Sequence, residues 1–220
     1  LGLEHRLVTK FDLSGIPAGA DVTAATLELY QYEWDGDAPP HTVRAYRVTR
    51  GWVEGTGVDQ FQSGHLGVSW EEAANGTAWS VPGGDYDTST DFGNGANGIV
   101  ASRALTTTDG AWQTWDLTAL VAAWVEGTQA NHGIVLISVA GDWSEHYFRS
   151  ADHATASTRP KLTVTYRGGG GEEPGEDTTP PGPVSGFDAN ATTTNILLTW
   201  QNPVDADFGG TRVLRKIGSY

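Results

Sequence analysis

The 220-residue sequence contains no cysteine and no methionine. Without cysteine no disulfide framework can form, which is ordinary for exported bacterial proteins and leaves the redox compartment open. Without methionine, Leu1 is not expected to be a translation start, so we expect the chain to be an internal piece of a longer protein. No apolar run approaches the roughly twenty residues of a membrane helix and no signal-peptide pattern occurs, so membrane insertion is not expected.

Charge is also scarce, and acidic residues outnumber basic ones by 27 to 13. Only 18% of the residues are charged, and the net charge is −14. Such an acidic chain disfavours nucleic acids and anionic membranes as partners and leaves calcium and neutral sugars open. The sequence has 29 glycines and is 10% aromatic, a composition that favours turn-rich β structure. Its length allows one good core and a second small module.

The segment 5–32 predicts two antiparallel strands joined by a loop over 14–20. Apolar residues recur at every second position on both sides of the loop, which is the pattern of half-buried strands that need a facing layer. The loop contains Pro17 and two glycines, as turns commonly do. The alternating positions are Leu7, Thr9, Phe11 and Leu13, then Ala25, Leu27 and Leu29.

Further strands are predicted over 42–49, 99–105, 111–117, 134–139 and 162–166. The apolar run 134–139 lies between glycines, which predicts a central strand buried on both faces. One short helix is expected, with Thr118 as its N-cap and Gly127 just after its end. The long, glycine-rich excursion 51–97 predicts loops that are functional or held by ordered side chains.

The composition changes after Tyr166. Glycines, acidic residues and prolines over 168–183 predict a linker between a domain at 1–167 and a second module at 184–220. The second module resembles the first half of a fibronectin type III domain, because the run P-P-G-P-V-S-G-F from Pro180 precedes an apolar strand that ends at Trp200. A complete domain of that kind has about seven strands, and about three are expected here.

The first domain resembles DNRLRE-type domains, which are jelly-roll sandwiches classed with carbohydrate-binding modules of secreted and surface proteins. The opening match is R-L-V-x-K-F-D-L-S-x-I-P-x-G-A-x-V-x-x-A-x-L-x-L from Arg6. Later matches follow in order at 52–55, 68–71, 82–87, 115–118, 131–134 and 160–164. The resemblance implies an all-β jelly-roll sandwich, here with one short helix, followed by a linker and a partial immunoglobulin-like sandwich. The family's usual first strand is missing from this sequence.

Nine tryptophans make a sugar-binding surface plausible, because aromatic rings stack on the apolar faces of sugars. Trp34, Trp79 and Trp143 lie in polar contexts and are predicted to be exposed, with Tyr86, Asp142 and Arg149 as polar partners. The alternative for any one tryptophan is core packing or a loop anchor. Core positions are predicted for Trp52, Trp70, Trp115, Trp124 and Trp200.

Acidic residues in the loop after 84 predict a structural calcium site. Asp85, Asp87 and Asp91 place carboxylate oxygens at short spacing between glycines, which is how a hard cation is gathered. The alternative is that each carboxylate caps its own turn. No catalytic residue is predicted, because the sequence has no nucleophile elbow and no H-E-x-x-H motif.

These observations predict a non-catalytic carbohydrate-binding or adhesive module of a secreted or cell-surface multidomain protein, with a polysaccharide or cell-surface glycan as its partner. One alternative is a structural spacer or a fibre subunit, self-associating by strand addition at an unpaired sheet edge. Another is an accessory part of a polysaccharide-degrading enzyme. Fold-level analogy alone does not decide among these functions.

Overall fold

The computed structural model of the chain describes residues 5–36, 41–56, 67–139, 144–168, 182–193, 196–204 and 210–211. The chain divides into two compact units, Leu1–Gly171 and Glu172–Tyr220, and the boundary falls inside the predicted linker. The regular structure described is almost entirely β, with one α-helix and one short 3-10 helix. The predicted all-β class is therefore confirmed.

The described part of the first unit contains ten strands and both helices. Its strands are β1 (Leu7–Thr9), β2 (Asp21–Gly36), β3 (Thr42–Arg47), β4 (Glu72–Ala74), β5 (Thr77–Ala78), β6 (Ile99–Ala104), β7 (Ala111–Asp116), β8 (Ile134–Ser138), β9 (Ser144–Phe148) and β10 (Lys161–Arg167). The helices are α1 (Thr118–Val125) and the 3-10 helix η1 (Ala156–Thr158). The second unit contains β11 (Ser185–Ala191) and β12 (Ile196–Gln201).

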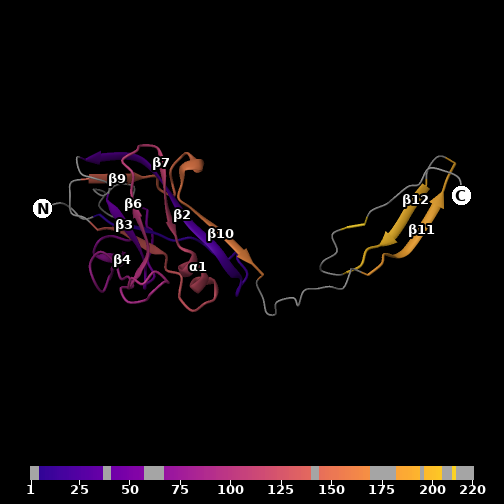
Figure 1. Ribbon diagram of the computed structural model, residues 1–220, viewed down its shortest axis with the longest axis horizontal. Helices are drawn as coiled ribbons and strands as arrows, with labels where there is room; N and C mark the ends of the chain where they lie inside the picture. Colours follow the sequence, from indigo (N-terminus) through magenta and orange to yellow (C-terminus); the bar gives the residue numbers. More distant parts are fainter. Residues whose placement is uncertain are drawn as a thin grey trace. The chain divides into compact units, whose positions relative to one another are not determined.

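Two antiparallel four-stranded sheets form the first unit. Sheet A has the order β1-β8-β3-β6, and sheet B has the order β10-β2-β7 with β9 also paired to β2. Gln31 of β2 pairs with β7 on one side and with Phe148 of β9 on the other, so β9 and β10 share one edge of β2. The long strand β2 therefore runs through the whole of sheet B (Figure 1).

The two sheets enclose the main core. In β2, Leu27 and Leu29 point inward and are fully buried, whereas the residues between them point to the other side of sheet B. Trp115 of β7 lies opposite Leu27 in the register and donates its indole N–H to the Val43 carbonyl of sheet A, 3.1 Å away. The period-two pattern of the sequence thus places one face of each sheet in a shared interior.

The predicted pairing of the first two strands is wrong. β1 pairs with β8 in sheet A, whereas β2 lies in sheet B, so the segment between them crosses from one layer to the other. Both strands do have the expected apolar face, and Leu7 and Leu27 reach the same core from opposite sheets. A shared core satisfies that pattern as well as a shared hairpin does, because alternation specifies a face and not a neighbour.

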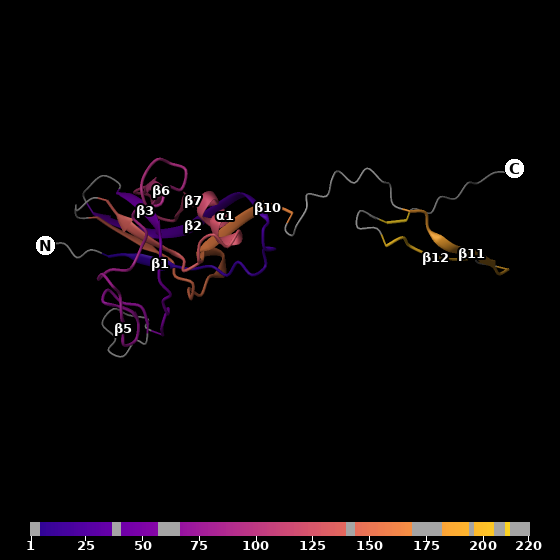
Figure 2. The ribbon, with the colours of Figure 1, turned by 90° about the horizontal axis from the view of Figure 1, so that it is seen from below.

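Sheet A is buried on both faces at β8. Ile134 and Leu136 point into the main core, whereas Val135 points to the outer side, as predicted for this apolar run. There the excursion after β3 folds back and contributes Ala73 and Trp79 to a second core against Val48 and Val135. Figure 2 shows this excursion, which includes β5, on the β1 side of the unit.

The helix α1 forms where predicted. Leu120, Val121 and Trp124 are its buried residues, and Gly127 follows with a φ of 75° that suits a glycine after a helix. Thr118 is the first helical residue and not the N-cap, which is Leu117. Its hydroxyl instead accepts a hydrogen bond from the Ala25 amide, 3.0 Å away, and ties the helix to β2. No helix among the described residues is long and apolar enough to cross a bilayer.

The second unit, described by itself, is an antiparallel hairpin of β11 and β12. Trp200, predicted to be a core residue, is partly buried and donates its indole N–H to the Asn202 side chain. Phe187 and Ile196 are exposed. The resemblance to a fibronectin type III domain stays a prediction.

Candidate functional site

The outer side of sheet B carries a group of aromatic residues that we call the aromatic face. Because Leu27 and Leu29 point inward, Tyr30 lies on the opposite side of β2, and Tyr32 follows at a β-bulge. On β7, Trp115 and Gln113 point inward, so Trp112 points outward beside Tyr30, its partner in the register. The aromatic face consists of Tyr30, Tyr32, Trp112 and Tyr147, with Arg149 and Lys161.

Its first half is built on β7, β2 and β10. The rings of Tyr30 and Trp112 meet edge to face with centroids 5.2 Å apart, an arrangement that aromatic pairs favour. The Lys161 ammonium lies 4.3 Å from the centroid of the Trp112 indole. It also lies 3.1 Å from the Glu28 carboxylate, which is on the same side of sheet B. The strands therefore hold a cation and an ion pair directly above the rings.

Its second half is built on β2 and β9. The rings of Tyr32 and Tyr147 lie 6.0 Å apart, and the Arg149 guanidinium stacks 3.9 Å from the Tyr32 centroid. The Tyr147 hydroxyl donates a hydrogen bond to Glu145, and this bond raises the pKa of Tyr147 to about 12. The phenol therefore stays protonated at physiological pH and remains a hydrogen-bonding group.

Arg149 is the predicted site residue that the structure places on this face. Its backbone N–H donates to the Tyr30 carbonyl at 3.0 Å, which fixes the chain just after β9. Among the described residues its guanidinium forms no ion pair with a carboxylate. Stacking thus orders the side chain while its N–H groups remain available at the ring edge.

Two predicted positions of tryptophan are wrong. Trp79 was expected to be exposed, but its side chain is only 5% exposed in the second core and donates its indole N–H to the Ser69 carbonyl. Trp70 was expected in the core, but it is 40% exposed and lies under the Arg6 guanidinium. Polar flanking residues misled the prediction for Trp79, because the excursion folds onto sheet A and buries that side chain. Trp70 lies between Ser69 and Glu71, and its exposure agrees with that polar context.

Of the other predicted sugar-binding residues that the structure describes, neither Trp34 nor Tyr86 belongs to the aromatic face. Trp34 is half-buried, pairs with His146 in the register, and has its indole N–H buried. Tyr86 packs beside Tyr46 in the second core. Asp142 and Trp143 lie outside the described residues.

The predicted calcium ligands each bind their own turn. Asp85 accepts hydrogen bonds from Ser80 and Val81, and Asp91 accepts three from the backbone of 93–95. Burial acts to raise the pKa of Asp85, but the bonds from Ser80 and Val81 outweigh it and lower that pKa. Within the described residues no group of three or more His, Asp or Glu side chains is placed to hold a metal ion. Calcium binding stays a prediction.

Asp87 is the most strongly held of these carboxylates. It accepts hydrogen bonds from Ser89 and Thr90 and pairs with the Arg47 guanidinium at 2.8 Å. Burial alone would raise the pKa of Asp87, but the bonds from Thr90, Ser89 and Arg47 lower it far below the ordinary value. This carboxylate anchors the excursion to β3, since Arg47 is the last residue of that strand.

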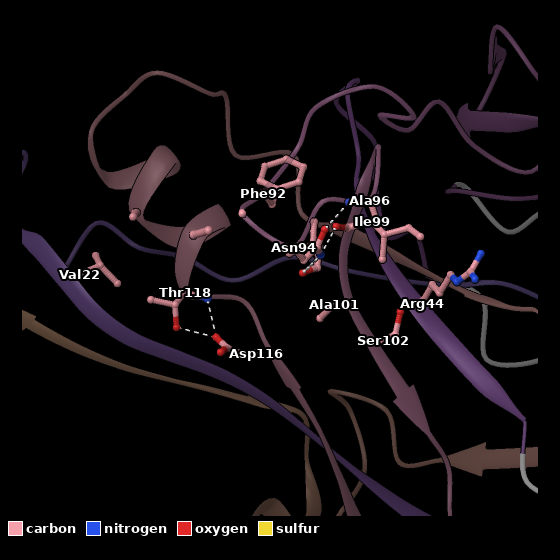
Figure 3. Close-up of a pocket in the computed structure, with 14 residues that line it drawn as sticks. Val22, Arg44, Phe92, Asn94, Ala96, Ile99, Ala101, Ser102, Asp116 and Thr118 are labelled. Atoms are coloured by element: carbon pink, nitrogen blue, oxygen red, sulfur yellow. Dashed lines mark hydrogen bonds between the residues drawn. The ribbon is translucent and has the colours of Figure 1, made fainter.

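A cleft of about 840 Å³ lies between β6 and α1. Phe92 and Asn94 line one side, and Asp116 and Thr118 line the other (Figure 3). Two of its polar side chains are already hydrogen-bonded: Asn94 donates to the carbonyl of Ile99, and Asp116 accepts from the amide and hydroxyl of Thr118.

Fold and face together define a β-sandwich module in which the described residues leave the outer side of sheet B uncovered and aromatic. The chain belongs to the disaggregatase related repeat domain family, whose family model matches residues 2–164. The matched residues are nearly those of the predicted DNRLRE-like domain, which stays a resemblance. No curated protein matches the chain. Membership of a family of repeat domains makes the first unit a repeat module of a multidomain protein.

Four aromatic residues of the face were not predicted from the sequence: Tyr30, Tyr32, Trp112 and Tyr147. The signal was present, because once Leu27 and Leu29 are assigned to the core, Tyr30 must lie on the other face of the same strand. In the same way, once Gln113 and Trp115 are assigned to the inner side of β7, Trp112 must lie on the outer side. The sequence could not show that the four aromatic residues lie close together, because this depends on which strands pair with β2.

Proposed function

We propose that the first unit is a non-catalytic glycan-binding module whose ligand lies across the aromatic face. The observation that carries this proposal is the pairing of Trp112 with Tyr30 and of Tyr32 with Tyr147 on the solvent side of one sheet. Aromatic rings pack against the C–H faces of sugars, and charged donors at their edges bond sugar hydroxyls. Arg149 and Lys161 would supply those donors.

The face is an open sheet surface, unlike the cleft between β6 and α1. Tyr30 and Tyr32 lie two residues apart along β2, so the two aromatic pairs follow one another along the strand. An open row of this kind suits a segment within a polysaccharide chain better than a single terminal sugar. We place the module outside the cell or at its surface, where it would hold a multidomain protein to such a glycan.

A panel of immobilised polysaccharides, neutral and acidic, tests the proposal by affinity electrophoresis of the whole chain. We expect selective retention on at least one polysaccharide. Trp112→Ala and Arg149→Ala should each weaken that retention about tenfold, which corresponds to about 1.4 kcal/mol. Trp70→Ala is the control, because it removes an indole that is more exposed than that of Trp112 and lies outside the aromatic face. Equal loss in all three variants, or no retention of the folded chain, would refute the proposal.

A structural role is the second candidate, and the repeat-domain family favours it. In this case the unit would space other domains or add strands to a neighbour at an open sheet edge. Size-exclusion chromatography over a range of protein concentrations measures this directly. A single monomer peak at every concentration would count against strand addition.

A further inference from the structure

Beneath the second half of the aromatic face, polar side chains replace the apolar core. Gln31 and Gln113 are 0% exposed, and His41, which immediately precedes β3, is 6% exposed. His146 of β9 points to the same inner side, since its Nδ1 lies 3.0 Å from the Gln31 side-chain oxygen. The cluster of Gln31, His41, Gln113 and His146 therefore lies between the two sheets.

The hydrogen bonds of Gln31 fix the protonation of His146. The Nε2 of Gln31 donates to the carbonyls of Thr106 and Thr108, at 2.9 and 3.2 Å, so the Oε1 of Gln31 is the atom that faces His146. Oε1 also accepts from Gln113 at 3.4 Å. An amide oxygen can only accept, so Nδ1 of His146 carries the hydrogen and Nε2 of the neutral ring carries a lone pair.

That lone pair is buried, and no group among the described residues bonds to it. A proton added at Nε2 would create a buried cation with a donor that has no acceptor, which is costly. The neighbouring ring offers no compensation. It belongs to His41, with centroids 5.9 Å apart, and the Nε2 of His41 is likewise buried without a partner in the described part of the chain.

The other groups at this site do not favour a positive charge. β6 contributes Arg103, opposite the inward-facing Val43, and its Nε is buried with no described partner. β2 contributes the buried indole N–H of Trp34, and β8 contributes the Ser138 hydroxyl, 3.3 Å from Nδ1 of His41. None of the described carboxylates forms an ion pair with either histidine. Glu145 lies on β9 beside His146 but points to the outer side, where it binds Tyr147.

We propose that His146 is an acid-sensitive latch that holds β9 in sheet B, and that its protonation opens β9 and dismantles the second half of the aromatic face. The link is direct, because Tyr147 and Arg149 follow His146 on the same segment and their side chains lie on the opposite side of the sheet. The opening itself is independent of any ligand. Its consequence, glycan release in acid, rests on the proposed function.

The direction of the pH effect follows from burial. Burial, and then the nearby His41, lowers the pKa of His146 below its ordinary value of 6.5. A histidine whose pKa is lower when folded stabilises the closed state above pH 6.5, and this stabilisation is lost as pH falls below that value. Each pH unit below 6.5 should then favour opening by up to about tenfold, until the folded histidine itself takes up the proton.

Hydrogen exchange of the ligand-free chain at pH 7.5 and pH 5.0 tests the latch. Protection factors, taken relative to unstructured-peptide rates at each pH, should fall about tenfold or more in 144–149 at pH 5.0 and change little in β8. His146→Asn keeps an N–H near the position of Nδ1 but cannot titrate, so its protection in β9 should not depend on pH. His132→Asn is the control, because burial also lowers the pKa of His132 and that residue lies away from β9.

The wild-type comparison decides the proposal even if a variant fails to fold. Unchanged protection in β9, or an equal loss in every strand, would overturn it, as would loss of the pH effect in His132→Asn. Retention on the polysaccharide panel at both pH values then separates the two proposals. Opening of β9 without retention at either pH would refute glycan binding and leave the latch standing. Equal retention at both pH values despite opening would refute the coupling between them.

Discussion

The outer faces of the two sheets differ in how far other parts of the unit cover them. Sheet A is covered by the excursion after β3, so Val135 and Trp79 meet in a second core. Sheet B has no such cover from the described residues, and Tyr30, Tyr32 and Trp112 remain partly accessible on it. A sheet face that is aromatic but uncovered is the more informative of the two, because packing within the chain does not account for its composition. The covered face contributes to stability, and the uncovered face is the one on which the proposed glycan binding depends.

The comparison is tested most severely by Trp79→Ala. This substitution removes the largest buried side chain of the second core and leaves a cavity there, so we expect a loss of about 3–5 kcal/mol in the free energy of unfolding. Urea denaturation monitored by circular dichroism measures it. Retention on a polysaccharide that binds the wild type should persist wherever the variant is folded. A loss below about 1 kcal/mol would show that the excursion is not a packed layer.

Asp87→Asn tests the anchor of the same cover. The amide would place an N–H group among the donors of Ser89, Thr90 and Arg47, so we expect a loss of about 1–3 kcal/mol at pH 7. Because folding lowers the pKa of Asp87, the wild type should lose this stabilisation as pH falls below about 4. The difference between the urea midpoints of the two proteins should be constant from pH 7 to about pH 5 and should begin to shrink between about pH 4 and pH 3. A constant difference across that range would contradict the assignment.

Trp112→Ala is the counterpart on sheet B. It removes the contacts with Tyr30 and Lys161, and both are partly accessible, so we expect a stability loss of only about 1–2 kcal/mol. Glycan retention should fall about tenfold, the reverse of the pattern expected for Trp79→Ala. A Trp112 variant that unfolds as readily as the Trp79 variant would remove the distinction between the two faces.

The smallest effect is expected from calcium. An ion shared by Asp85, Asp87 and Asp91 would have to displace hydrogen bonds that these carboxylates already accept, so we expect a rise of at most a few degrees in melting temperature. Differential scanning fluorimetry with calcium and with chelator makes the comparison, and Asp91→Asn is the variant of choice because Asp91 accepts its hydrogen bonds in an exposed turn. Identical melting in both conditions would remove the calcium prediction.

Periodicity predicted the class of fold and most of its strands. β3, β6, β7 and β8 begin at predicted residues, and α1 ends shortly before Gly127, as expected. Periodicity could not predict which strands pair with each other, as the assignment of β1 and β2 to different sheets shows. The face of a strand is encoded every second residue, but its neighbour is chosen by the whole chain.

The candidate site was predictable only in part, for the same reason. Arg149 was predicted as a polar partner of exposed tryptophans, but it stacks on Tyr32, which lies more than a hundred residues earlier in the chain. Trp79 was misassigned because local polarity does not reveal that a loop folds back over a sheet. A single sequence therefore does not reveal the long-range contacts of side chains that are both polar and apolar, such as arginine, tyrosine and tryptophan.

The unequal strand lengths at the two ends of the first unit have a mechanical consequence. β1 is three residues long and pairs only with β8 among the described strands, whereas β10 has seven residues paired along β2. If tension were applied through both ends of the unit, β1 would detach first, at a low force. The long strand β2 would keep β7, β9 and β10 together, so that a stretched repeat could extend at one end without losing its aromatic surface.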